Sequence, residues 1–73
     1  MPGAAVIGEE LRVQGYALAG ALVCPAEDHD GAAAAWRSLP PDIAVAILTP
    51  RTAAWLGDEL GQRPSVLTVV MRA

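Results

Sequence analysis

Glu9 and Glu10 are the first residues whose types and spacing could do chemistry. They follow the apolar run Ala4–Ile7 and Gly8, a pattern typical of a short buried strand. A phosphate cradle would need several glycines and usually a Lys, but the chain has neither GxGxxG nor GxxxxGK[ST]. We therefore interpret the pair as acids in the first turn of a helix, where they face the positive end of its dipole.

His29 is the centre of a second polar group, and its neighbours are Glu27, Asp28 and Asp30. This composition could suggest a metal, but consecutive ligands on one loop rarely converge and the chain has no second His. The segment favours a solvated loop in which Asp28 or Asp30 caps the next helix.

Cys24 is the only cysteine, so no internal disulfide can form and a reducing compartment is expected. It ends the apolar run Ala21–Cys24 and has no adjacent charge, so it is interpreted as a small apolar core residue. With no nucleophile beside a base, we predict no catalytic, cofactor-binding or metal-binding residues. The chain is not expected to be an enzyme by itself.

Composition indicates a single domain, 1–73, with a net charge of −3. The chain has no Lys, and its arginines are scattered rather than gathered into the positive face that nucleic acid or an anionic membrane needs. No apolar run reaches the length of about 20 residues that spans a bilayer, and no secretion signal is expected, since no basic region stands ahead of the first apolar run. The expected location is cytoplasmic.

The run Ile43–Leu48 is the element around which the fold is predicted to form. It is apolar at successive positions, so it belongs to a strand covered on both faces. Further strands are expected at Ala4–Ile7, Ala21–Cys24 and Val66–Val70, with a helix in each gap. The β-α-β-α-β-α-β order predicts a flavodoxin-like or receiver-like α/β fold, with a four-stranded parallel sheet of order 2-1-3-4 and helices on both faces.

Each predicted helix has an apolar stripe that would face the sheet. The stripes are Leu11, Gly15 and Leu18 in the first helix, Ala32, Ala35, Trp36 and Leu39 in the second, and Ala53, Leu56 and Leu60 in the third. The third helix would begin at the cap Thr49-Pro50 and end at Gly61. Trp55 falls on the opposite side of that helix, among polar neighbours that include Arg51.

Three short motifs carry a resemblance to a known family. They are Val6-Ile7-Gly8, the segment Gly15–Gly20 (GYALAG) and Ile47-Leu48-Thr49. In these motifs and in strand order, the chain resembles the F-subunit family of archaeal/vacuolar-type (V-type) rotary ATP synthases. The resemblance implies a non-catalytic rotor part that binds the coiled-coil D-type subunit of the central stalk, inside the A/B catalytic assembly. It also implies a part in coupling proton or sodium transport to ATP synthesis or hydrolysis.

Trp55, Arg51 and Tyr16 are the residues predicted to bind this partner. Trp55 is proposed because a large aromatic ringed by polar side chains is typical of an interface anchor, and Tyr16 lies within the GYALAG segment. The alternative for Trp55 is that its ring folds back over the helix surface, or that the helix phase differs by one position, so that Trp55 belongs to the core. Members of the family usually continue into a C-terminal helix, whereas this sequence stops shortly after Val70. Because the first helix alone would cover one face of the sheet, side chains of the third and fourth strands on that face should stay partly exposed and bind a partner or a second copy. Apolar candidates include Val66, Leu67, Val69 and Val70, although the strand phase does not say which of them face that side.

Two other interpretations remain open. A degenerate receiver-like interaction domain would have the same strand order, but a working receiver needs an Asp after its third strand and a Lys after a later one; here Thr49 follows the third strand. A small nucleotide-binding or other small-molecule-binding domain is the second alternative.

Overall fold

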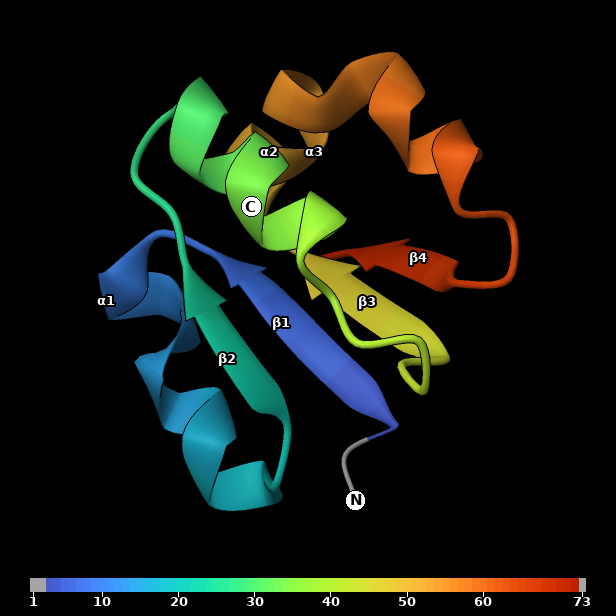
Figure 1. Cartoon of the computed structure of the whole chain (residues 1–73). Coiled ribbons are helices and arrows are strands. Elements are labelled where there is room, and N and C mark those ends of the chain that lie inside the picture. The colour runs from blue at the N-terminus through green and yellow to red at the C-terminus, as the bar shows by residue number, and fades with distance from the viewer. Residues whose placement is uncertain (1–2, 73) are drawn as a thin grey trace.

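The computed structural model describes residues 3–72, which form a four-stranded parallel sheet with helices on both faces (Figure 1). The strands are β1 (Ala4–Gly8), β2 (Leu22–Pro25), β3 (Val45–Leu48) and β4 (Leu67–Val70). Their order across the sheet is β2-β1-β3-β4, which confirms the predicted topology. The strands β1 and β3 are therefore central, while β2 and β4 are the two edges.

The helices are divided unequally between the two faces of the sheet (Figure 1). The helices α2 (His29–Arg37) and α3 (Pro50–Leu56) pack together on one face, and a 3₁₀ helix, η2 (Gly57–Gln62), continues α3. On the other face, α1 (Glu10–Val13) and the 3₁₀ helix η1 (Gln14–Ala19) lie against β1 and β2. Among residues 3–72, no helix combines the length and the hydrophobicity needed to cross a bilayer.

The main core lies between the sheet and the α2/α3 layer. Alternate side chains of the two central strands point into it and are fully buried, namely Ala5, Ile7, Ala46 and Leu48. From the helical layer, Trp36 is the largest side chain in this core and is 1% exposed. A buried aromatic side chain removes about 150–250 Å² from water, which at about 25 cal/mol per Å² stabilises the fold by about 4–6 kcal/mol.

Both longer helices begin as the sequence predicts. Asp28 caps α2 because its Oδ1 accepts a hydrogen bond of 2.7 Å from the Gly31 N–H. Thr49 caps α3 by accepting from the Thr52 N–H, and Pro50 occupies the first turn. Gly57 has a φ of +48°, and there the α-helix ends, short of the predicted end at Gly61.

The predicted inner stripe of the first helix is wrong. Leu11 and Leu18 are 84% and 95% exposed, and a Cβ placed on Gly15 would meet nothing within 4 Å. Val13 is fully buried instead and Tyr16 is half-buried. The reason is that α1 lasts one turn and continues as a 3₁₀ helix with three residues per turn, so residues three apart share the inner side.

Strand boundaries differ slightly from the predicted ones. Ile43 is buried but precedes β3, and its N–H donates to the carbonyl of Pro40 in a turn. Similarly, Val66 is buried ahead of β4 and donates to the carbonyl of Arg63. Apolar side chains in the turns leading into β3 and β4 therefore continue the hydrophobic core beyond the strands themselves.

Candidate functional site

The carboxyl ends of β1 and β3 bring Glu9 and Thr49 together, at the place where open parallel sheets bind ligands. The hydroxyl of Thr49 donates to Oε1 of Glu9 across 2.5 Å, and the hydroxyl oxygens of Thr49 and Thr52 lie 3.0 Å apart. Thr49 and Thr52 are fully buried. Gly8 lies so close that a Cβ there would stand 2.8 Å from Oγ1 of Thr49.

The electrostatics of this group favour the ionised form of Glu9. The hydrogen bond from Thr49 holds the pKa of Glu9 below its usual value, and Arg51 and Arg12 act in the same direction with smaller effects. Desolvation opposes them. The carboxylate is thus held by a structural hydroxyl that also caps α3, so the group joins two strand ends to a helix start.

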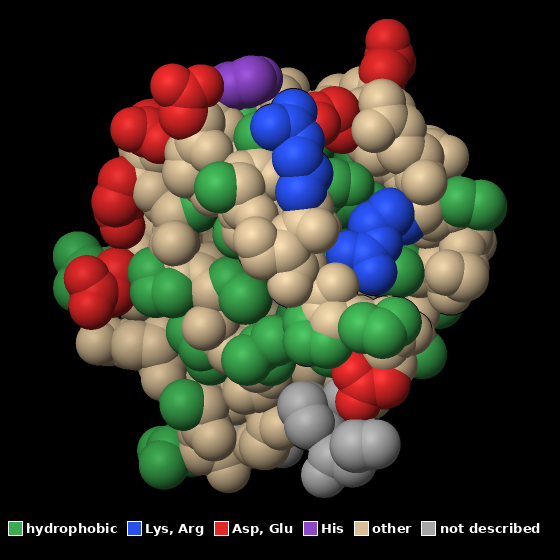
Figure 2. All heavy atoms as spheres, viewed as in Figure 1, with side chains coloured by type: hydrophobic (Ala, Val, Ile, Leu, Met, Phe, Trp, Pro, Cys, Tyr) green, Lys and Arg blue, Asp and Glu red, His purple; other side chains and the backbone are tan. Residues whose placement is uncertain are grey.

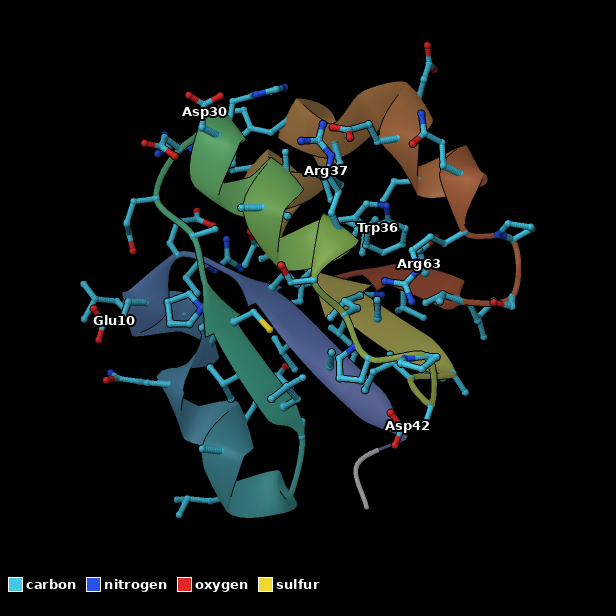
Figure 3. The ribbon with its side chains drawn as sticks, viewed as in Figure 1. Glu10, Asp30, Trp36, Arg37, Asp42 and Arg63 are labelled. Carbon is cyan, nitrogen blue, oxygen red and sulfur yellow. The ribbon has the colours of Figure 1, made fainter. Side chains whose placement is uncertain are left out.

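Glu10 does not join Glu9 as an acid pair. Its backbone N–H donates to Oε2 of Glu27 at 2.8 Å, which connects the start of α1 to the loop after β2. The side chain of Glu10 is directed outward from the edge of the fold (Figure 3). The two glutamates are therefore engaged in different contacts.

The His29 group lies on the surface where α2 begins. Figure 2 shows acidic side chains gathered near the single histidine at that edge of the molecule. Nδ1 of His29 is 3.5 Å from Oδ1 of Asp30, and both side chains are largely exposed. Throughout residues 3–72, no three or more His, Cys, Asp or Glu residues are placed to hold a metal ion.

Cys24 is half-buried on the edge strand β2, beside Ile7 of β1, and packs against the main core. Desolvation raises the pKa of its thiol. A raised pKa lowers the thiolate fraction at neutral pH, and the thiolate is the reactive form. The environment of Cys24 is that of a structural residue.

The predicted partner-binding residues Arg51 and Trp55 form a pair on α3. The guanidinium carbon of Arg51 lies 5.8 Å from the centre of the Trp55 ring, a cation–π contact. Arg51 is exposed, whereas Trp55 is half-buried and packs against the main core. The expectation that Trp55 faces away from the core is therefore wrong: only part of its ring surface is open to a partner.

Tyr16, the third predicted residue, is half-buried in η1 on the other face of the sheet. It therefore lies on a different surface from Arg51 and Trp55. A single flat partner could not cover all three residues from one side.

An open apolar strip lies on the same face of the sheet as α1. It consists of Val45, Ile47, Leu67 and Val69, which share one side of β3 and β4 in register. Leu67 and Val69 are 64% and 46% exposed, and the two β3 residues are half-buried. The strip confirms the expected exposure of Leu67 and Val69, while Val66 is buried and Val70, 51% exposed, lies on the opposite side of β4.

The third strand was expected to be partly exposed on this face, and Val45 and Ile47 confirm that expectation although neither was named as a candidate. The signal was present in the alternation of Val45, Ala46 and Ile47, but the phase of the strand alone does not say which face is open. Arg12 of α1 also reaches the strip, because its Nη2 donates to the carbonyl of Arg72 at 2.9 Å, just beyond the end of β4.

The surface of residues 3–72 contains no detectable pocket. Searches of protein-family models, curated proteins and solved structures found no match to the chain.

Proposed function

We propose that this chain is a non-catalytic protein-binding domain whose partner is the coiled-coil stalk subunit of a V-type rotary ATPase. In this role it takes part in the central rotor that couples ion transport to ATP synthesis or hydrolysis. The family resemblance of the GYALAG segment and of the strand ends is one support for the proposal. The observation that carries it is the open apolar strip of Val45, Ile47, Leu67 and Val69.

The width of the strip fits a helix. Neighbouring strands lie about 4.8 Å apart, so β3 and β4 together present a band about 10 Å wide. An α-helix with its side chains is about 10 Å across. In α/β folds, helices cover both faces of a parallel sheet, as α1 and η1 do over β1 and β2. A helix supplied by another protein would complete the layer.

A helical coiled coil also suits the chemistry of the strip. The four strip side chains are aliphatic and uncharged, and the guanidinium of Arg12 lies at one end, bonded to the Arg72 carbonyl. An amphipathic helix would place its apolar stripe on the aliphatic residues and an acidic side chain near Arg12. The pair Arg51 and Trp55 on the opposite face would then serve a second element of the stalk.

The test is co-purification of the chain with the coiled-coil stalk subunit, using two variants that place the same charge on different elements. Leu67→Lys puts an ammonium group in the strip and should abolish co-purification. Leu11→Lys is the matched control, since Leu11 is also strongly exposed but lies on α1. We expect the control to bind as the original chain does, and circular dichroism should show that both variants are folded.

Failure of the unaltered, folded chain to bind the coiled-coil stalk subunit would overturn the proposed partner. Equal binding by both lysine variants would place the contact elsewhere than on the strip. In the first case a receiver-like interaction domain with another partner becomes the better interpretation, whereas in the second the stalk subunit stays the partner and contacts another surface of the chain. A large thermal stabilisation by nucleotides would instead favour a nucleotide-binding domain, since a ligand at about 100 times its Kd adds about 2.7 kcal/mol.

A further inference from the structure

The edge strand β4 leaves its outer backbone groups open in a regular pattern. The N–H groups of Leu67 and Met71 donate to the carbonyls of Ala44 and Leu48. The odd-numbered residues of this segment therefore form the hydrogen bonds with β3. Hydrogen-bonding direction alternates along a strand. The N–H and C=O groups of Thr68 and Val70 therefore point away from the sheet.

The side chains of β4 make this edge unusual. Leu67, Val69 and Val70 are all exposed large hydrophobic residues, and the run Val66–Met71 contains no charge and no proline. Proteins commonly protect an edge strand with a lysine, a proline or a bulge, because an open apolar edge pairs readily with another strand. The opposite edge differs: the residues of β2 from Leu22 to Cys24 are half-buried, and η1 packs beside them.

We propose that β4 pairs antiparallel with β4 of a second copy across a two-fold axis at Val69, which joins the two sheets into one of eight strands. This inference goes beyond the proposed function and does not depend on the coiled-coil partner. In this register Thr68 of one copy lies opposite Val70 of the other, and each pair exchanges two backbone hydrogen bonds. Four hydrogen bonds therefore form from groups that point outward in the single chain.

The register of the proposed β4–β4 pairing follows from backbone groups that already make hydrogen bonds within the single chain. Centring the axis one residue earlier, on Thr68, would require the backbone of Val66 to pair, but its N–H already donates to the Arg63 carbonyl. Centring it one residue later, on Val70, would require the Arg72 carbonyl, which accepts from Arg12. The axis at Val69 uses Thr68 and Val70 alone.

A second copy is favoured as the occupant because the edge is self-complementary. In the proposed register Val69 faces Val69, Leu67 faces Met71, and Thr68 faces Val70, so aliphatic side chains meet and no like charges are opposed. The same patch serves both copies, as a two-fold interface requires. A four-residue strand buries less than the about 800 Å² per partner of a standard interface, so the dimer should depend strongly on concentration.

The test combines molar mass with residue-resolved hydrogen exchange on the unaltered chain. Light scattering should show the mass rising from 7.5 kDa toward twice that value between about 10 μM and 1 mM. In the dimer, the amides of Thr68 and Val70 should be protected and should lose protection on dilution. Leu67 and Val69 should stay protected at both concentrations, since their N–H groups face β3.

Val70→Pro is the specific variant, because it removes an outward N–H without touching a hydrogen bond to β3. With both copies altered, two of the four bonds are lost, and dimerisation should weaken about 30-fold. Val70→Thr keeps the N–H and nearly the same shape, so it should dimerise as the original chain does. A chain that stays monomeric at 1 mM, or a dimer in which Thr68 and Val70 exchange as in the monomer, would overturn the proposal; the exchange measurement needs no variant.

Discussion

Arg63 lies across the end of α2 with its guanidinium carbon 5.9 Å from the centre of the Trp36 ring (Figure 3). Its Nη1 donates hydrogen bonds of 3.0 Å to the carbonyls of both Trp36 and Leu39. The Trp36 carbonyl also accepts from the Leu39 N–H in the turn that follows α2, and a cation at this end opposes the negative end of the helix dipole. The indole N–H of Trp36 in turn donates to the carbonyl of Glu59 in η2.

Replacing Arg63 with Ala should therefore destabilise the fold by about 2 kcal/mol, because partly buried carbonyls lose a charged donor. Arg37→Ala is the matched control: Arg37 bonds Glu59 through an exposed ion pair of 2.7 Å, which should contribute less than about 1 kcal/mol. In thermal unfolding the first change should lower Tm by about 10 °C and the second by only a few degrees. Equal effects would mean that Arg63 acts only as a surface charge.

Gly8→Ala should destabilise the fold by about 2 kcal/mol, because the new methyl group would overlap with the Thr49 side chain. Gly15→Ala is the opposite case, since nothing lies within 4 Å of the position and alanine favours helix; it should be neutral or stabilise by up to about 1 kcal/mol. Urea unfolding of both variants gives the comparison. A destabilising Gly15→Ala would restore the prediction that Gly15 faces the sheet.

The contrast between these two glycines shows how far a sequence can predict such a fold. Long apolar runs with caps, such as Ile43–Leu48 leading to Thr49-Pro50, predict strand order and helix starts, because burial and capping act locally. The change to a 3₁₀ helix after Val13 leaves no comparable local signal, and it moves every later side chain to a different side. For this reason the inner side predicted for Gly15 and Leu18 was wrong.

The candidate site was predictable only in part, for a related reason. The exposure of Leu67 and Val69 follows from having one helix on the α1 face, which the element order predicts. Contacts that join distant segments, such as Thr49 with Glu9 or Arg12 with Arg72, depend on side-chain directions in the folded chain. No spacing in the sequence encodes them.

Glu9 should make stability depend on pH in the acid range. Its pKa is lower in the folded chain than its usual value of 4.5, so the unfolded chain binds more protons in acid. The contribution of Glu9 is then fully present above about pH 4.5 and is lost as the pH falls through the folded-state pKa. Urea unfolding at a series of pH values should show this loss, and Glu9→Gln should reduce it. An unchanged slope in Glu9→Gln would show that other carboxylates cause the acid dependence.

The last prediction separates the two members of the α3 pair. Because Trp55 packs against the core, Trp55→Ala should destabilise the isolated chain by about 2–3 kcal/mol, somewhat less than truncating a fully buried aromatic. Loss of partner binding in that variant would therefore be ambiguous. Arg51 is exposed, and Arg51→Gln removes its charge from the ring of Trp55 at a cost below about 1 kcal/mol.

Arg51→Gln is accordingly the variant that tests whether the α3 surface contacts the coiled-coil stalk subunit. If it does, co-purification should fall several-fold while Tm changes by only a few degrees. Arg37→Gln is the control with the same change of charge on the neighbouring helix α2, and it should bind as the original chain does. Equal loss in both variants would indicate a general electrostatic effect, and no loss in either would assign partner binding to the open strip alone, with Arg51 serving only to cover Trp55.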